Sequence, residues 1–75
     1  MVVNSRGIEA RSLICDYIAW HVANRGYPPT IRDISNEIGL SVAGVHYHLR
    51  VLTEMGVIEH TPGVARGVRL VRGYL

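Results

Sequence analysis

The hydrophobic spacing of this chain changes at Gly56, and the change limits the folds that the sequence can adopt. Before Gly56, apolar residues recur at intervals of three and four, the spacing of one face of an α-helix. After it, residues 57–60 and 67–71 have the alternating or β-branched composition of strands, and Thr61-Pro62-Gly63 between them favours a turn. The sequence therefore predicts helices followed by one β-hairpin.

Capping and turn residues divide the helical part into three predicted helices. The first covers residues 8–25 and stops at Gly26, because the two prolines that follow cannot continue a helix. The second follows Thr30, a capping residue with Asp33 as its acidic partner three positions later. The residues expected to face the core are Ala10, Ile14, Tyr17, Ile18, His21 and Val22 in the first helix, Ile31, Ile34 and Ile38 in the second, and Val42, Val45, Leu49 and Leu52 in the third.

The second and third predicted helices have the arrangement of a helix-turn-helix. Gly39 permits a tight turn, Ser35 is small where two helices cross, and Ser41 caps a third helix that ends near Gly56. An αα-hairpin in an unrelated small helical protein is the alternative, and the β-hairpin that follows favours a winged helix. The expected fold is mostly α, a three-helix winged helix-turn-helix with a small β-hairpin, in a single domain over residues 1–75.

The net charge of +2 is modest, but its distribution points to a nucleic-acid partner. As far as Glu37, four arginines are balanced by four carboxylates, whereas from Ile38 onward four arginines face two glutamates. The chain contains no lysine, and arginine is the cation whose planar group pairs with phosphate and guanine edges. A basic surface formed by the second half of the chain is therefore expected.

Several function classes are disfavoured by composition. Cys15 is the single cysteine, so no internal disulfide can form. No uninterrupted apolar stretch is long enough to span a bilayer, and residues 1–6 lack the features of a secretory signal. A soluble cytoplasmic protein is expected.

Several short motifs are unusual in combination. In chain order they are Gly26-Tyr27-Pro28-Pro29-Thr30, Asp33-Ile34, Gly39-Leu40, His48-Leu49, Leu52, Gly56-Val57-Ile58-Glu59 and Arg66-Gly67-Val68-Arg69-Leu70. Over about residues 10–71 the chain resembles the N-terminal DNA-binding domain of the LexA family, the repressors of the SOS response. The resemblance implies a winged-helix fold, double-stranded DNA as the ligand, and repression of transcription.

Two features depart from that family. The run from Gly39 to His48 is one residue shorter than in the family, so individual base contacts are not carried over. LexA repressors also continue into a C-terminal domain that dimerises and cuts its own chain, and no such domain is present in this sequence. Tight binding is therefore expected to need a second copy on a neighbouring half-site.

No enzyme activity, metal or cofactor is expected. The family's self-cleavage uses a serine activated by a lysine, and the serines of this sequence have no lysine to activate them. A Ser-His-Asp arrangement has no local signature in the sequence. A metal site built from His46, His48 and Cys15 is disfavoured, because alternate residues on a helix diverge and no paired cysteines accompany them.

Helical spacing turns one side of the third helix away from the core, and its residues are candidates for reading DNA in the major groove. Arg50 suits a guanine edge or a phosphate. Tyr47 and His46 can donate to base edges or phosphate. Ala43 and Gly44 allow close approach and contact with a thymine methyl group.

Three further residues are expected to contact the DNA backbone. Ser41 lies at the positive end of the third helix, which suits a phosphate. Arg66 and Arg69 on the hairpin are expected to grip the backbone or an adjacent minor groove. The alternative for each exposed polar residue is a merely solvated side chain. His48 lies at the margin of the inward stripe and is expected to be a hydrogen-bonded packing histidine.

A protein-docking module is the alternative function, because winged helices also bind proteins. Leu13 and Trp20 are two turns apart on the first helix but lie off its inward stripe. They could form an outward apolar patch. The favoured interpretation is that they pack under the hairpin or under Tyr74 and Leu75.

Overall fold

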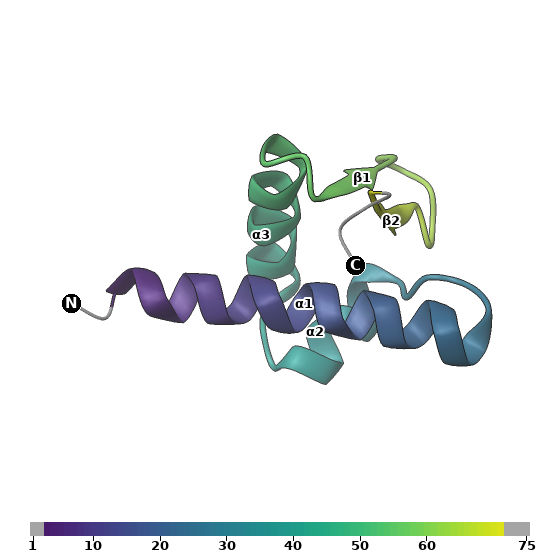
Figure 1. The fold of residues 1–75 in the computed structure, drawn as a ribbon, viewed down its shortest axis with the longest axis horizontal. Helices are drawn as coiled ribbons and strands as arrows, with labels where there is room; N and C mark the ends of the chain where they lie inside the picture. The colour runs from purple at the N-terminus through teal and green to yellow at the C-terminus, as the bar shows by residue number, and fades with distance from the viewer. Residues whose placement is uncertain (1–2, 72–75) are drawn as a thin grey trace.

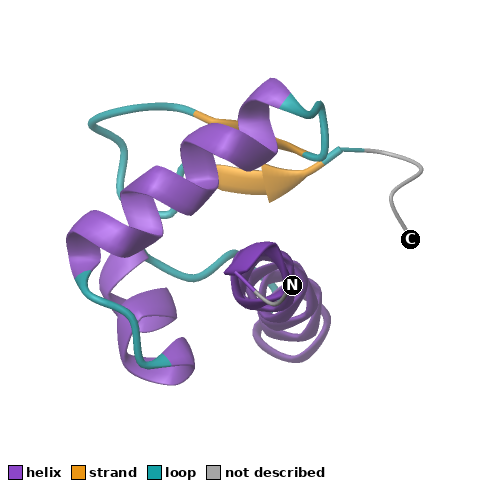
Figure 2. Ribbon diagram, turned by 90° about the vertical axis from the view of Figure 1, so that its left-hand side faces the viewer, coloured by secondary structure: helices purple, strands orange, loops and turns teal. Residues whose placement is uncertain are grey.

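Three helices and a hairpin follow one another along the chain (Figure 1). The computed structural model describes residues 3–71. The elements are α1 (Val3–Arg25), α2 (Ile31–Ile38), α3 (Val42–Glu54), β1 (Ile58–His60) and β2 (Val68–Leu70). Figure 2 views the molecule along the axis of α1. Helices α2 and α3 lie to one side of α1, and the hairpin lies against α3. The predicted three-helix winged helix-turn-helix is confirmed.

Helix α1 begins five residues earlier than predicted. The sequence prediction started at Ile8, the first residue with apolar periodicity, whereas the helix starts at Val3. Apolar periodicity marks only the part of a helix that packs on the core. In Figure 1 the first turns of α1 extend beyond α3, away from the other elements.

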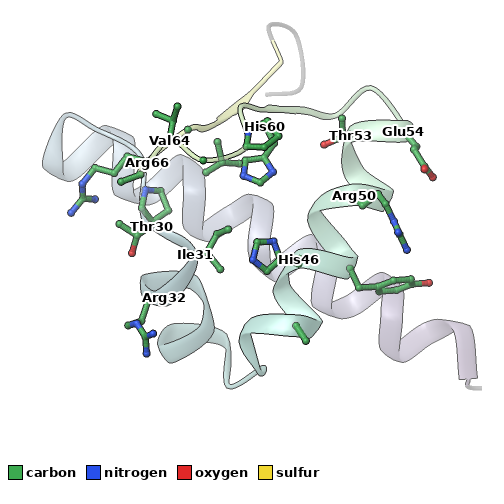
Figure 3. Close-up of a pocket in the computed structure, with 18 residues that line it drawn as sticks. Thr30, Ile31, Arg32, His46, Arg50, Thr53, Glu54, His60, Val64 and Arg66 are labelled. Carbon is green, nitrogen blue, oxygen red and sulfur yellow. The ribbon is translucent and has the colours of Figure 1, made fainter.

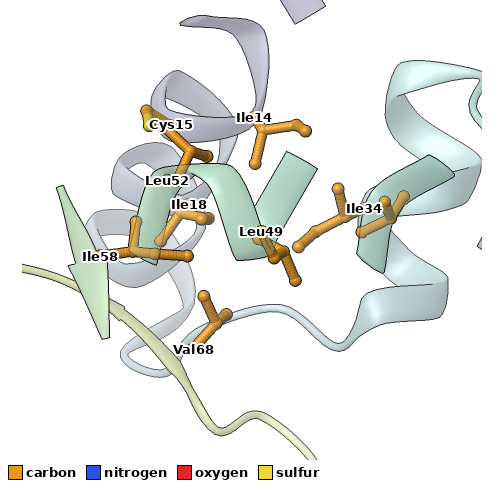
Figure 4. Packing of buried hydrophobic residues seen from close by; sticks show 9 residues of the cluster. Ile14, Cys15, Ile18, Ile34, Leu49, Leu52, Ile58 and Val68 are labelled. Carbon is orange, nitrogen blue, oxygen red and sulfur yellow. The ribbon is translucent and has the colours of Figure 1, made fainter. Parts of the chain in front are cut away.

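The core takes residues from every element (Figure 4). Its buried members are Ile14, Cys15, Ile18, Ile34, Val45, Leu49, Leu52, Ile58 and Val68. Six of the nine were predicted to face inward, whereas Cys15, Ile58 and Val68 were not, and two predicted core residues are exposed. Because α1 meets α2 and α3 on one side and β2 on another, its buried face is wider than the stripe expected from spacing alone.

The two wrong core assignments are both valines. Val22 is 42% exposed, because the adjacent His21 takes the buried position near the end of α1, where its Nδ1 donates to the Tyr27 carbonyl at 2.7 Å. Val42 is 38% exposed. It is the first residue of α3, and helical side chains point toward the N-terminal turn, so Val42 projects over the turn and away from the core.

Local hydrogen bonds hold the helix-turn-helix together as the capping residues predict. Thr30 Oγ1 accepts from the Asp33 N–H at 3.0 Å, and the Thr30 N–H donates to the Asp33 carboxylate at 3.0 Å. Gly39 ends α2 with φ 81°, a conformation that favours glycine. The Ser35 hydroxyl donates to the Leu40 carbonyl at 2.6 Å, so this predicted crossing residue also fixes the turn.

The hairpin is a two-stranded antiparallel ribbon in which Glu59 pairs with Arg69, and its strands are shorter than the predicted 57–60 and 67–71. We call residues 58–70 the wing. Gly67 lies in its tight return loop, where a Cβ would approach the Thr61 and Val64 carbonyl oxygens to 2.7 and 2.8 Å. The loop therefore has no room for a side chain at position 67. Over residues 3–71, no helix combines the length and apolar content needed to cross a membrane.

Candidate nucleic-acid interface

A groove of about 1030 Å³ separates α3 from the wing and the start of α2 (Figure 3). Thr30 and Arg32 lie on its α2 side, and Arg50 and Glu54 on its α3 side. The other residues that line it include Ile31, Ala43, His46, Tyr47, Thr53, His60, Val64 and Arg66. Folding thus joins the exposed side of the predicted reading helix to two other segments in one concave surface.

The exposed face of α3 carries the predicted reading residues. Ala43, His46, Tyr47 and Arg50 are all exposed, and all line the groove. The Arg50 guanidinium lies 5.9 Å from the centroid of the Tyr47 ring, close enough for a cation–π contact. This contact orders two long side chains in the free protein, which lowers the entropy lost when they bind a ligand.

Ser41 and Gly44 have a structural task at the start of α3. The Ser41 hydroxyl accepts the Gly44 N–H at 3.0 Å and caps the helix. Neither residue lines the groove. Their contacts with DNA stay predictions. A contact at Ser41 would lie at the N-terminal end of α3.

The two wing arginines have different surroundings. Arg69 forms an ion pair with Glu59 across the hairpin, and both side chains are more than half exposed. Such a pair contributes little to stability and exchanges partners easily. Arg66 lines the groove and is held by contacts with residues 27, 28 and 33. Arg69 does not line the groove, and contact of either arginine with DNA stays a prediction.

Sequence reasoning missed several residues of the groove. Arg32 was counted in the half of the chain with no excess charge, yet it lines the groove on the α2 side, across from α3. His60 ends β1 with its ring centroid 6.5 Å from that of His46. The capping box at Thr30 shows that Arg32 lies in the first turn of α2, but no signal in the sequence shows that this turn lines the groove. Within the described part of the chain, no three His, Cys, Asp or Glu side chains form a group able to hold a metal.

His48 is a packing histidine, as predicted. Arg11 Nη1 on α1 donates to His48 Nδ1 at 3.3 Å, and a guanidinium has no acceptor, so Nδ1 must be unprotonated in this contact. Burial, and then the positive charge of Arg11, lower the pKa of His48. His48 therefore joins α1 to α3 in its neutral form.

A family model described as the LexA DNA binding domain matches residues 9–67. The chain belongs to the LexA DNA-binding domain family. Its relatives include the LexA repressors of Desulfatibacillum aliphaticivorans, 35% identical over 65 residues, and of Methylococcus capsulatus, 48% identical over 59 residues. The matches cover 85% and 77% of this chain but 32% and 29% of the relatives.

The chain thus spans about a third of the length of the curated relatives that it matches. The LexA repressor of Saccharophagus degradans is 41% identical over 58 residues, and the match likewise covers only 29% of its length. The match extends from α1 to the wing, so it includes most of the groove. The residues of α3 that line the groove therefore lie within the part of the chain that matches the LexA DNA-binding domain.

Among the described residues, the ring contacts of Trp20 in this LexA-family domain lie on α1, and none is with the wing. Trp20 and Leu13 are each 49% exposed. The ring of Trp20 stacks at 6.2 Å on Tyr17 and lies 5.8 Å from the guanidinium of Arg25, both on α1. Packing under Tyr74 and Leu75 lies outside the described residues.

A pH dependence of stability follows from His48. Because its pKa is lowered in the folded domain, protonation favours the unfolded chain. The stability due to neutral His48 is present above the usual histidine pKa of about 6.5 and is lost as pH falls below it. We expect urea midpoints to fall less between pH 7 and pH 5 in His48→Gln than in the wild type. The exposed His46→Gln is the control, and equal falls in the wild type and His48→Gln would contradict the assignment.

Proposed function

We propose that this chain binds duplex DNA at preferred sequences as a repressor of transcription, with α3 in the major groove and the wing on the backbone or in the adjacent minor groove. The observation that carries the proposal is the groove itself, whose α3 side is formed by the exposed residues Ala43, His46, Tyr47 and Arg50. The major groove of B-DNA, about 12 Å wide, admits an α-helix.

The chemistry of the α3 face suits base edges. Arg50 can donate two parallel hydrogen bonds to a guanine, and Tyr47 beside it can donate or accept. His46 lies toward the wing, near His60. Ala43 has a small side chain near the start of α3, where the helix can come closest to the DNA. Glu54 lies near the far end of α3, where its negative charge opposes contact with phosphate.

The proposed contacts outside α3 are sequence-independent. Ser41 would contact a phosphate at the N-terminal end of α3, close to Gly44. Arg69 is exposed and can leave Glu59 for a phosphate at small cost. Arg66 supplies a positive charge at the wing side of the groove. Arg32, at the start of α2, adds a cation that the sequence did not predict.

The proposed activity is binding without catalysis. The sequence contains no lysine that could activate a serine. The hydroxyls of Ser35 and Ser41 are engaged in hydrogen bonds that hold the helix-turn-helix. A repressor needs only to occupy its site, so the binding surface is sufficient for this function.

Selection of bound duplexes from a random DNA pool at fixed salt tests the proposal. We expect enrichment of a short motif, with affinity for the enriched duplex well above that for a random one and falling as salt rises. A binder without preference would show the salt dependence alone. Equal affinity for enriched and random duplexes would contradict sequence-specific binding.

A second copy is proposed to bind beside the first. One domain presents one reading helix and can read one half-site, and a neighbouring half-site lets a second domain add its contacts. We expect weak binding to a single half-site and tight binding of two copies to a doubled site, measured by titration together with sedimentation of the free protein. A tight one-to-one complex with a single half-site would contradict this arrangement.

Protein docking through α1 is the second candidate function, because Leu13 and Trp20 are half exposed. Trp20 does not line the groove, so DNA in the groove leaves its surroundings unchanged. A protein that covers α1 would change both the emission of Trp20 and its quenching by solutes. A Trp20 response to a protein partner, with no motif enriched from the DNA pool, would favour docking over DNA binding.

A further inference from the structure

Arg66 fastens the wing to the segment that leads into α2. Its guanidinium lies 4.4 Å from the centroid of the Tyr27 ring, and Nη1 donates to the Pro28 carbonyl at 2.8 Å. The same nitrogen lies 3.5 Å from the Asp33 carboxylate. We propose that Tyr27 and Asp33 are positioning residues for DNA binding, which act through Arg66 to set how the wing stands against α3. This inference rests on the proposed function and deepens it.

The backbone of the wing supports this role for Arg66. Arg66 has φ 61°, and it is the non-glycine residue with positive φ in the described part of the chain. Side chains other than glycine rarely adopt this conformation, because the Cβ comes too close to the backbone. The strain persists only if other interactions hold the residue there. The three contacts of the guanidinium are interactions of that kind.

Asp33 provides a rigid anchor for Arg66. Its carboxylate already accepts the Thr30 N–H in the capping box that starts α2. That backbone hydrogen bond, the largest cause, lowers the pKa of Asp33, and Arg66 lowers it further. The carboxylate therefore stays charged near neutral pH. Because Thr30 lines the groove, the Asp33 side chain connects the wall of the groove to Arg66 in the return loop of the wing.

Tyr27 and Asp33 are well placed to separate positioning from direct contact. Neither lines the groove, whereas Arg66 does. Replacing Asp33 therefore changes the affinity for DNA through two effects of opposite sign. Removing a negative charge attracts DNA and frees Arg66 to bind phosphate, which strengthens binding. Releasing the wing from its anchor costs ordering entropy on binding, which weakens it.

The decisive experiment compares Asp33→Asn with Glu59→Gln. Both remove one carboxylate that pairs with a wing arginine, but Glu59 pairs with Arg69 within the wing and anchors it to nothing else. An asparagine at 33 can still accept the Thr30 N–H, so the start of α2 keeps its cap. We expect Asp33→Asn to weaken binding of the selected duplex by about 2- to 5-fold, the size of a partly exposed ion pair. Glu59→Gln is expected to strengthen binding or leave it unchanged.

Tyr27 gives an independent pair of variants. Tyr27→Leu removes the aromatic face beneath the guanidinium, and Tyr27→Phe keeps it. We expect weaker DNA binding in the first and wild-type binding in the second. Binding that is stronger or unchanged in both Asp33→Asn and Tyr27→Leu would overturn the proposal.

Hydrogen exchange in the free protein separates this inference from the proposed function. The Gly67 N–H donates to the Val64 carbonyl at 3.0 Å, and the Thr61 N–H donates to the Gly67 carbonyl at 3.0 Å. We expect these two amides to exchange faster in Asp33→Asn, while the core amides of α3 stay protected. Arg66→Gly, which removes the guanidinium and also the strain of positive φ, should give the same result in a folded domain. Unchanged exchange in both variants would refute the anchor, whereas faster exchange without DNA binding by the wild type would refute the proposed function alone.

Discussion

Leu49→Ala is expected to remove a large part of the stability of this domain. Leu49 is fully buried in the cluster that joins α1, α2, α3 and the wing. Truncation of a buried leucine costs about 2–5 kcal/mol, because apolar contact is lost and a cavity remains. At about 0.05–0.15 kcal/mol per residue, a chain of 75 residues has about 4–11 kcal/mol in total. Urea unfolding followed by circular dichroism measures the loss as a lower midpoint.

Met55→Ala is the matched control for this prediction. Met55 follows α3 and is 62% exposed, so the same kind of truncation removes little buried surface there. Surface substitutions of this kind change the free energy of unfolding by about 0.5 kcal/mol or less. A loss below about 1 kcal/mol for Leu49→Ala would mean that the packing around α3 tolerates a cavity, and the description of the core would be wrong.

Local patterns in the sequence predicted the elements well, because each signal acts over a few residues. The capping box of Thr30 and Asp33, the turn at Gly39 and the cap at Ser41 all join groups at most five positions apart. Such interactions depend on residue type and spacing, which the sequence displays directly. The class of fold followed from these signals and from the change of hydrophobic period at Gly56.

Packing between elements was predicted less well. The exposure of Val22 and Val42 and the burial of Cys15 depend on where neighbouring helices end, which spacing along one helix does not reveal. Cys15 is buried although it lies off the inward stripe that helical spacing predicts for α1. Predicting its burial requires the crossing of α1 with α3 and the wing.

The candidate site was predicted on α3 but only partly elsewhere. The exposed face of α3 follows from its helical period, whereas the groove depends on contacts such as Arg66 with Pro28, which are 38 positions apart. Counting charge by halves of the chain placed Arg32 outside the basic region, although it lines the groove. Long-range contacts of this kind leave no periodic trace in the sequence.

Alanine at Arg50 or at Tyr47 is expected to lower sequence preference more than general affinity for DNA. A contact with a base edge counts only when the right base is present, so its loss costs about 1–3 kcal/mol on the preferred site and flattens the preference at one or two base pairs. Tyr47 is 52% exposed and Arg50 is exposed, so neither substitution should disturb the core. Titration of the selected duplex and of variants with single base changes measures the effect.

Arg69→Ala supplies the contrast, because Arg69 is proposed to contact the DNA backbone. We expect it to weaken binding to all sequences nearly alike and to make the logarithmic salt slope shallower by about one unit for each lost phosphate contact. Arg66→Ala should also weaken all sequences alike, through its charge and through the release of the wing from Asp33. If the preference survives alanine at both Arg50 and Tyr47, other residues read the bases, and the proposed placement of α3 in the major groove is wrong.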